Sequence, residues 1–336
     1  MGQSSGTARV VVVGCGRWGR NHVRNYAELG ALAGVVDRHP ERAAAMAEAH
    51  GVPALSLEDA IGSSDVSGIV FALPPSQNLP LGLRVLEAGK HLFVEKPLAL
   101  SVSEGARLCA AAEAGRRVLM VGHILRYHPA FAALLGLVHG GRLGRVRSIV
   151  STRLDLGAIR REEDALWALA PHDVSMVLAL TGAEPDRVSA FGGYHTHSDI
   201  ADTATLALRF PGGAAAEIRS SWLHPYKEQR LVVVGTEAMA VFDDREPWPR
   251  KLAFHPYRIV ETGGTALIER GEPEAVPVEE GEPLRLECRQ FLRSIASGEP
   301  PPTDGREALR VLRVLEAGSA ALLSGCQATS PQHYKA

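Results

Sequence analysis

The chain has 336 residues, of which 46% are hydrophobic and 22% are charged, and its formal net charge is -2. This balance suits a globular protein with room for two domains, and it argues against nucleic acid as a partner because no basic or acidic excess is present. The four cysteines lack metal-type spacing, the N-terminus lacks the apolar core of a signal peptide, and no apolar run approaches the ~20 residues of a membrane helix. We therefore expect a cytoplasmic protein without membrane contact.

The first third of the chain alternates predicted strands and helices. A β-branched run over 8–14 ends in glycines, and it is followed by a helical stretch to about residue 32 and a strand that ends at residue 37. Further helices are predicted from residue 40, from the capping-box-like start at residue 56, over 78–88 and from residue 101, with strands over 67–73, 91–95 and 116–123 between them. This alternation predicts an α/β chain that begins with a Rossmann domain, a doubly wound parallel sheet, over residues 1–124.

Beyond residue 124 the pattern changes to strands joined by short turns. After a helix at about 129–140, strands are predicted over 144–154, 186–195, 203–210 and 214–223, with a hairpin over 232–244. Ala204, Leu206, Leu208 and Phe210 lie on one face of their strand, which is typical of a sheet with one solvent face. Helical spacing returns over 284–295 and 306–324. The second domain, residues 125–336, is therefore predicted to be an α+β domain built on an open, mostly antiparallel sheet.

The sequence GCGRWG places Gly14, Gly16 and Gly19 at GxGxxG spacing between a predicted strand and a predicted helix. Such glycines let the backbone approach a pyrophosphate, whose charge then meets the amides of the helix N-terminus. Asp37 follows the second strand, where a carboxylate accepts hydrogen bonds from ribose hydroxyls and repels a 2′-phosphate. NAD is therefore the predicted cofactor, although the neighbouring Arg38 could pair with the phosphate of NADP or stack on the adenine. The alternative is a glycine turn that binds no ligand.

Two charges, Glu95 and Lys96, follow the apolar run HLFV in the stretch VEKPLAL, residues 94–100. Ligands of doubly wound sheets bind beyond the carboxyl ends of the strands, so these side chains are expected at the mouth of a cofactor cleft. The chain contains 31 Arg and only 5 Lys, which favours Lys96 as a donor whose pKa can change on desolvation. The alternative is a solvated lysine at a strand end.

Six segments carry a family resemblance. GCGRWGRNH, LPPSQN, AGKHLFVEKPLA, GHILRYHPAF and ALWALAPHDVSM occur in this order, followed by PPTDGREALRVLRVLEA near the C-terminus. Over essentially its whole length the chain resembles the Gfo/Idh/MocA family of NAD(P)-dependent sugar and cyclitol oxidoreductases. The resemblance implies a Rossmann domain, an open-sheet domain through which homodimers or homotetramers form, and a small-molecule sugar substrate.

The resemblance also implies roles for individual residues. Lys96 would hydrogen-bond the reacting hydroxyl, His172 would act as the acid/base, and Glu95 would contact the nicotinamide ribose. The further predicted cofactor contacts are Arg17, Trp18, Leu73, Pro74 and Asn78, and the further predicted substrate contacts are Arg126, Tyr127, His128, Arg153, Asp155 and Trp167. No metal site is expected, because the histidines of YHTH, His195 and His197, have no third ligand nearby in the sequence.

The residue types fit the oxidation of a secondary alcohol. A histidine, with an ordinary pKa of about 6.5, accepts the hydroxyl proton near neutrality, and a charged Lys96 stabilises the developing alkoxide. Two positions depart from the family pattern. Ala168 replaces the acid expected one turn before His172, and Asp173 is a poor substitute because neighbours on a helix point about 100° apart; Asn78 stands where many relatives have histidine.

Within the family, the segment from residue 153 to 175 resembles dehydrogenases that oxidise C3 of a hexose unit, in nucleotide-sugar and aminoglycoside pathways. The product would be a 3-keto sugar, the substrate of a subsequent transamination. Asp155 and Asp164 favour a cationic aminoglycoside-type glycoside, whereas Arg153 and Arg160 could bind the phosphates of a nucleotide sugar. Both aspartates could instead be solvated.

We therefore predict an NAD-dependent dehydrogenase that acts on a hexose unit, with an aminoglycoside-type substrate ahead of a UDP-hexose. The alternatives are an inositol-type dehydrogenase, an NADPH-dependent ketoreductase and, in a different class, a dinucleotide-binding sensor without chemistry. A sensor has no need of Lys96 and His172.

Overall fold

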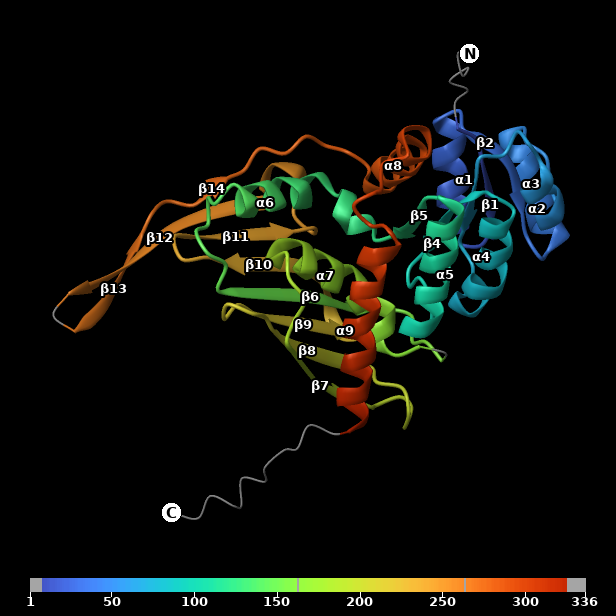
Figure 1. The fold of residues 1–336 in the computed structure, drawn as a ribbon. Helices are drawn as coiled ribbons and strands as arrows, with labels where there is room; N and C mark the ends of the chain where they lie inside the picture. The colour runs from blue at the N-terminus through green and yellow to red at the C-terminus, as the bar shows by residue number, and fades with distance from the viewer. Residues whose placement is uncertain (1–7, 162, 263, 325–336) are drawn as a thin grey trace. The chain divides into compact units, whose positions relative to one another are not determined.

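The computed structural model describes residues 8–161, 163–262 and 264–324 (Figure 1). It contains two compact units. The first comprises the chain up to His128 together with Gly281–Leu312, and the second comprises Pro129–Glu280 together with the chain from Arg313 onward. None of the helices in these ranges has the length and hydropathy to span a membrane.

These units differ from the contiguous division at residues 124 and 125 that the sequence predicts. Helix α8 (Pro283–Ser297) and the start of α9 (Gly305–Leu323) belong to the first unit. The physical reason is hydrophobic: the apolar face of α8, with Leu284, Cys288 and Phe291, is buried in the core of the first unit.

The first unit is built on a five-stranded sheet in the order β2-β1-β3-β4-β5, and every pairing in it is parallel. The predicted Rossmann-type sheet is thus confirmed. Its elements in chain order are β1 (Val10–Val13), α1 (Gly19–Glu28), β2 (Leu32–Val36), α2 (Pro40–His50), α3 (Leu57–Gly62), β3 (Gly68–Phe71), η1 (Pro75–Gln77), α4 (Asn78–Glu87), β4 (His91–Glu95), α5 (Val102–Gly115), β5 (Leu119–Gly122) and η2 (Ile124–Tyr127), joined by α8 and the first part of α9.

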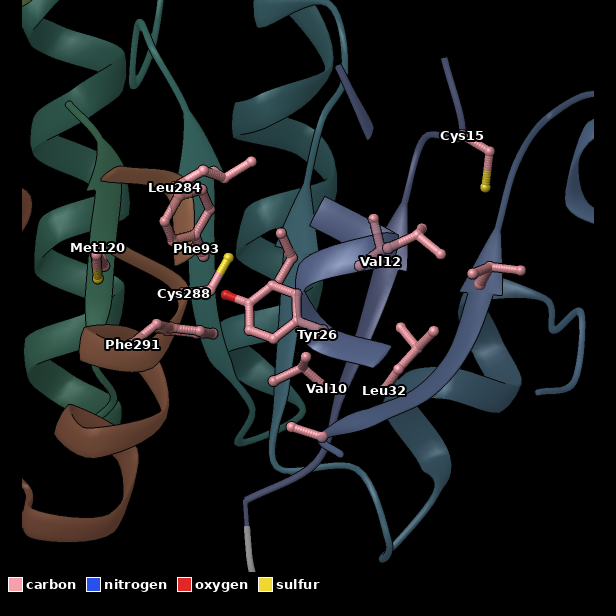
Figure 2. Close-up of a cluster of buried hydrophobic side chains, with 14 of the residues drawn as sticks. Val10, Val12, Cys15, Tyr26, Leu32, Phe93, Met120, Leu284, Cys288 and Phe291 are labelled. Atoms are coloured by element: carbon pink, nitrogen blue, oxygen red, sulfur yellow. The ribbon is translucent and has the colours of Figure 1, made fainter. Parts of the chain in front are cut away.

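Helices cover both faces of this sheet, because alternate strand residues point to opposite sides. On one face, Val10, Val12 and Phe93 pack against α1 and α8 (Figure 2). On the other face, a side chain on Gly82 of α4 would collide with Leu92 and with Leu108 of α5. Both faces are buried, which explains why the strands read as continuous apolar runs.

Local sequence signals define several helix ends. Ser56 and Ser101 accept hydrogen bonds from the amides of Asp59 and Glu104, so both predicted N-caps are confirmed. Helix α1 ends at Glu28, earlier than predicted, because the chain turns at Gly30, which has φ 67°.

The second unit is built on a mixed, mostly antiparallel sheet of nine strands in the order β13-β12-β11-β10-β6-β9-β8-β7, with β14 paired to β12. Among the described strands of this second sheet, only the β6–β9 pair is parallel. Its elements are α6 (Pro129–His139), β6 (Ser148–Leu156), α7 (Ala165–Thr181), β7 (Arg187–Gly193), β8 (Thr203–Arg209), β9 (Ala215–Ser221), β10 (Leu223–Val234), β11 (Ala238–Asp243), η3 (Trp248–Arg250), β12 (Leu252–Thr262), β13 (Thr265–Arg270) and β14 (Glu274–Ala275), followed by the remainder of α9.

One face of this second sheet is buried and the other is open. Ala204, Leu206 and Leu208 of β8 are buried, as the alternation predicts, and α7 packs over β6, β8 and β9. Phe191 of β7 is exposed. The helix layer therefore lies on the face that the apolar alternation selects.

Candidate active site

The three glycines of the first loop differ in what surrounds them. Gly14 has φ 97°, and a Cβ there would lie 2.4 Å from the carbonyl oxygen of Ala72; a Cβ on Gly19 would lie 1.7 Å from the carbonyl oxygen of Gly14. Both glycines are thus required by packing. A Cβ on Gly16 would meet no described atom within 4 Å. The chain itself does not require a glycine there, but a pyrophosphate approaching the backbone does.

Asp37 joins this loop to the end of β2. Its Oδ2 accepts the amide of Cys15 at 2.6 Å, and its Oδ1 accepts the amide of His39 at 2.8 Å. A carboxylate has about four acceptor sites, so capacity remains for ribose hydroxyls. The guanidinium of Arg38 is exposed, and its Nε lies 3.1 Å from Nε2 of His39. The loop, the helix N-terminus behind it and Asp37 fit a dinucleotide.

Glu95 and Lys96 lie at the carboxyl end of β4, and both are half-buried. Oε1 of Glu95 accepts hydrogen bonds from Nε1 of Trp18, in the glycine loop, and from Nε2 of His22, at 2.6 Å. The structure thus brings Glu95 to the glycine loop from 77 residues away. Lys96 is the next residue in the chain, directly after β4. Trp18 is 41% exposed, so it can meet both Glu95 and a ligand.

Asn78 supports the turn that follows Lys96. It is buried, and its Nδ2 donates to the carbonyl oxygens of Pro97 and Leu98 at 3.1 and 3.2 Å. An amide can donate both hydrogens in this way. Leu73 is half-buried and Pro74 exposed in the segment after β3. Cofactor contacts for these three residues and for Arg17 stay predictions.

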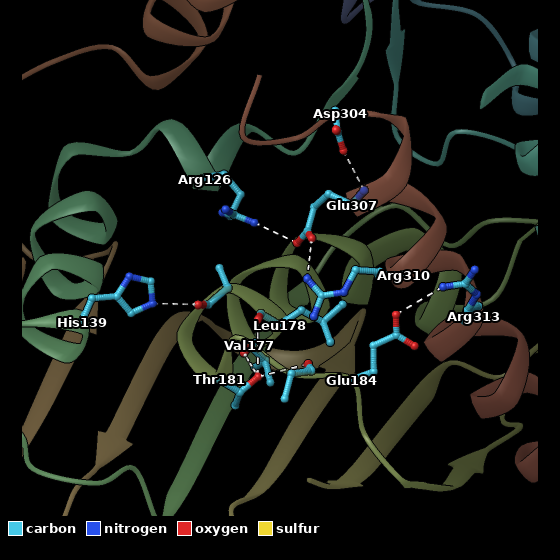
Figure 3. Close-up of polar contacts among 12 residues, drawn as sticks. Arg126, His139, Val177, Leu178, Thr181, Glu184, Asp304, Glu307, Arg310 and Arg313 are labelled. Carbon is cyan, nitrogen blue, oxygen red and sulfur yellow. Dashed lines mark hydrogen bonds and ion pairs between the residues drawn. The ribbon is translucent and has the colours of Figure 1, made fainter. Parts of the chain in front are cut away.

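The segment Arg126–His128 is held inside the first unit. The Arg126 guanidinium pairs with Glu307 at 3.0 Å, with only a tenth of its side chain exposed (Figure 3). The hydroxyl of Tyr127 lies 2.8 Å from Oγ1 of Thr303, and burial, followed by Glu287, raises the Tyr127 pKa above its ordinary value. His128 is buried. Substrate contact by this segment stays a prediction.

Acidification should destabilise the first unit, because two of its histidines resist protonation. Burial, followed by the charges of Arg126 and Lys96, lowers the pKa of His123 to about 3, and burial with Arg117 lowers the pKa of His91 to about 4. In the unfolded chain both pKa values are about 6.5, so below that pH the unfolded state binds more protons and the free energy of unfolding falls. Urea unfolding measured above about pH 6.5, and again between that pH and the lowered pKa values, gives the loss in the free energy of unfolding.

The variant His91→Gln isolates one of these contributions. Glutamine does not titrate, so the variant should lose less stability than the parent between neutral pH and the lowered pKa of about 4. Equal losses in the two proteins would contradict the assignment to His91.

In the second unit, His172 lies in α7 and is half-buried. Ala168, one turn earlier, is 3% exposed in a small apolar cluster with Ala165 and Trp222. A carboxylate at position 168 would therefore be desolvated by apolar neighbours. Trp167 is half-buried and its Nε1 donates to Oγ of Ser319 at 2.7 Å.

Three of the charged residues predicted near the substrate, Arg153, Arg160 and Asp164, have partners within the second unit. Arg153 donates to both oxygens of Asp173, with Nε 2.6 Å from Oδ2, and Ser151 donates to Oδ1 at 2.7 Å. Asp173 thus points toward β6. Asp164 caps α7 by accepting the amide of Trp167 at 2.9 Å, while burial raises its pKa. Arg160 pairs with Glu163, and Asp155 is half-buried on β6.

Removing Arg153 should destabilise the protein, because its partner Asp173 is 1% exposed. Loss of one member of a buried pair leaves an uncompensated charge and costs about 3–5 kcal/mol. We expect Arg153→Ala to lower the free energy of unfolding by that amount in urea. Arg209→Ala, whose pair with Asp186 is exposed, is the control and should change it by less than about 1 kcal/mol. Unchanged stability with a raised KM would instead indicate substrate binding by Arg153.

Two buried polar residues of the first unit were missed in the sequence. His22 is fully buried, and its Nε2 donates to Oε1 of Glu95. The feature of the sequence that could have indicated this role is a histidine one turn into the helix that follows the glycine motif. Glu287 is fully buried, neither of its oxygens has a hydrogen-bond partner among the described residues, and burial raises its pKa well above the ordinary value. The feature of the sequence that could have indicated a buried carboxyl group is a glutamate on the apolar face of α8. No group of three metal-ligating residues occurs in the described ranges.

A parallel doubly wound sheet with an open glycine position and a carboxylate after its second strand defines a dinucleotide-binding protein. Comparison with family models agrees with that class. A model described as the oxidoreductase family, NAD-binding Rossmann fold, matches residues 8–123, and one described as the GFO/IDH/MocA C-terminal domain matches residues 131–241. The chain belongs to the Gfo/Idh/MocA family.

Named relatives narrow the class of reaction. UDP-N-acetylglucosamine 3-dehydrogenase of Acidithiobacillus ferrooxidans is 31% identical over 305 residues, 90% of this chain and 94% of its own length. A solved structure of that enzyme, GnnA, has a TM-score of 0.84 at 29% identity and covers 95% of this chain and 98% of its own. Inositol 2-dehydrogenase of Rhizobium meliloti is 28% identical over 255 residues, 72% and 77% of the two chains. The chain is accordingly an oxidoreductase of a family whose named relatives act on a nucleotide sugar and on inositol.

Proposed function

We propose that the protein oxidises the C3 hydroxyl of a hexose unit to a ketone with NAD. The observation that supports the proposal is the contact between Glu95 and Trp18 of the glycine loop, because it joins the carboxyl end of β4, which Lys96 directly follows, to that loop. Ligands of doubly wound sheets bind at that edge. The likeness to a UDP-N-acetylglucosamine 3-dehydrogenase supports the sugar and the position.

NAD is proposed in preference to NADP because of Asp37. Its carboxylate is fixed at the end of β2 by the amides of Cys15 and His39, where it would repel a 2′-phosphate. Arg38, exposed and next to His39, is a group at this edge that could accommodate the phosphate. The bound cofactor supplies the hydride acceptor.

Two residues carry the proposed proton chemistry. His172 takes the proton of the reacting hydroxyl, since an imidazole accepts a proton near neutrality. Lys96 donates a hydrogen bond to the same oxygen and stabilises the negative charge that develops on it. Glu95 accepts a hydrogen bond from the cofactor ribose. Proton transfer and stabilisation of the developing negative charge are thus the roles of different side chains.

For the substrate we propose a nucleotide-linked hexose ahead of an aminoglycoside-type glycoside. The cationic alternative rests on Asp155 and Asp164, and Asp164 is accounted for as the N-cap of α7. Asp155 alone continues to favour a cationic substrate. In the other direction, the similarity to a UDP-sugar enzyme covers 90% of the chain.

The proposal also includes assembly of copies through the open face of the second sheet. That face carries exposed apolar side chains, among them Val150 at 36% and Phe191 at 64%. Exposed apolar surface commonly marks an interface. Mass measurement in solution distinguishes a dimer from a tetramer.

A substrate panel tests the proposed function. NADH formation is followed with UDP-glucose, UDP-N-acetylglucosamine, free inositols and hydroxylated aminoglycosides, each with NAD and with NADP. We expect the highest kcat/KM for a UDP-hexose with NAD, and product analysis locates the ketone. Activity on inositols alone would exclude a glycosyl substrate. Reduction of keto sugars preferentially with NADPH would identify a ketoreductase, and cofactor binding without turnover would identify a sensor.

A further inference from the structure

The carboxyl group of Glu95 is held asymmetrically. Both donors that reach it, Nε1 of Trp18 and Nε2 of His22, bind the same oxygen, Oε1. Oε2 accepts no hydrogen bond from the described residues, and 13% of the side chain is exposed. One oxygen is thus used for internal contacts, and the other is left to accept a hydrogen bond from a ligand.

His22 has a defined hydrogen-bonding direction. Its Nδ1 lies 3.7 Å from Sγ of Cys288, whose pKa is raised well above its ordinary value by burial. Cys288 therefore remains a thiol that can donate weakly to Nδ1. Because a carboxylate oxygen only accepts, Nε2 is the ring nitrogen that donates to Glu95. Packing holds the ring as well, because Phe93 meets it edge-on with centroids 5.1 Å apart.

Gly122 supplies the space that the carboxyl group occupies. It is paired with Glu95 across the parallel ladder between β4 and β5. A Cβ on Gly122 would lie 3.0 to 3.1 Å from three atoms of the Glu95 carboxyl group. The φ of Gly122 is not in the left-handed region. The glycine therefore serves the placement of the carboxyl group rather than a backbone turn.

We propose that His22 and Gly122 are positioning residues, which together fix Glu95 so that its Oε2 accepts a hydrogen bond from a hydroxyl of the nicotinamide half of the cofactor. The inference rests on the proposed function through the cofactor. It assigns no catalytic role to His22, which is fully buried and acts through Glu95. It also accounts for a fully buried polar ring packed against the core residues Tyr26 and Phe93.

The test uses two unlike perturbations of Glu95 and two ligands. His22→Leu removes the donor, and Gly122→Ala crowds the carboxyl group while leaving every donor in place. For each variant the Kd is measured by calorimetry for NAD and for ADP, which lacks the nicotinamide half. A hydrogen bond to a charged group corresponds to a loss of about tenfold in affinity. We expect that loss for NAD in both variants, with little change for ADP.

Control variants separate positioning from folding. His22→Gln keeps a donor near the place of Nε2, so it should restore most of the NAD affinity. Gly62→Ala and His50→Leu, a helical glycine with open space around it and a histidine near a helix end, should change neither Kd. Equal losses for NAD and ADP would indicate general damage to the cofactor domain and would overturn the proposal.

A measurement without any ligand completes the test. The emission of Trp18, obtained by subtracting the spectrum of a Trp18→Phe protein, should shift in His22→Leu and Gly122→Ala because the indole donates to the displaced carboxylate. If the parent protein binds neither NAD nor ADP, the proposed cofactor is wrong, yet the Trp18 shift still decides the link between His22 and Glu95. No shift in either variant would refute that link.

Discussion

Replacing Lys96 with methionine should lower kcat about 10²- to 10³-fold, the usual loss when one donor to a developing oxyanion is removed. Methionine keeps most of the length of the unbranched side chain and removes the ammonium group. Affinity for NAD should change little, because the glycine loop and Asp37 are untouched. Steady-state kinetics and calorimetry on the same preparation measure the two quantities.

A lysine far from the chemistry provides the control for this substitution. Lys227 is exposed on β10, so Lys227→Met should leave kcat and KM unchanged. Lys96→Arg is informative as well, because a planar, always-charged guanidinium does not reproduce a compact ammonium. Full activity in Lys96→Met would show that the proposed role of Lys96 is wrong.

Two alanine variants of the glycine loop should separate an effect on NAD affinity from an effect on the free energy of unfolding. Gly16→Ala adds a methyl group where no described atom lies within 4 Å, so stability should stay the same while NAD affinity falls tenfold or more, about 1.4 kcal/mol. Gly19→Ala places Cβ 1.7 Å from the carbonyl oxygen of Gly14 and should destabilise the protein by at least about 3 kcal/mol. Urea unfolding and NAD titration measure the two effects.

The contrast between these two variants is the decisive result. If Gly16→Ala lost stability as well, the glycine would be serving the loop and not a ligand. If it kept both stability and NAD affinity, the pyrophosphate would have to approach the chain somewhere else, and the dinucleotide site would need to be placed anew.

Several features could be predicted because they depend on neighbours in sequence. The N-caps at Ser56 and Ser101 use amides three residues away. The buried face of β8 follows from the two-residue alternation of Leu206 and Leu208. The alternation of strands and helices likewise led to the parallel sheet and to the position of the glycine loop.

Other features depend on residues that are distant in sequence. Asn78, predicted to border the cofactor, also donates to the carbonyls of residues 97 and 98. Arg153, predicted near the substrate, is also paired with Asp173. A polar side chain at a candidate site reads the same way in the sequence whether it meets a ligand or a neighbour, and only the folded arrangement distinguishes the two.

By itself, the sequence determined the fold class, the family and the edge of the sheet where Lys96 stands, because periodicity, caps and motifs are local properties. Only the tertiary structure showed that α8 joins the first unit and that His22 and Gly122 surround the carboxyl group of Glu95. The reason is physical: burial and hydrogen-bond geometry arise when residues separated by 73 positions, or by 266 in the case of His22 and Cys288, come into contact. No local pattern encodes those distances.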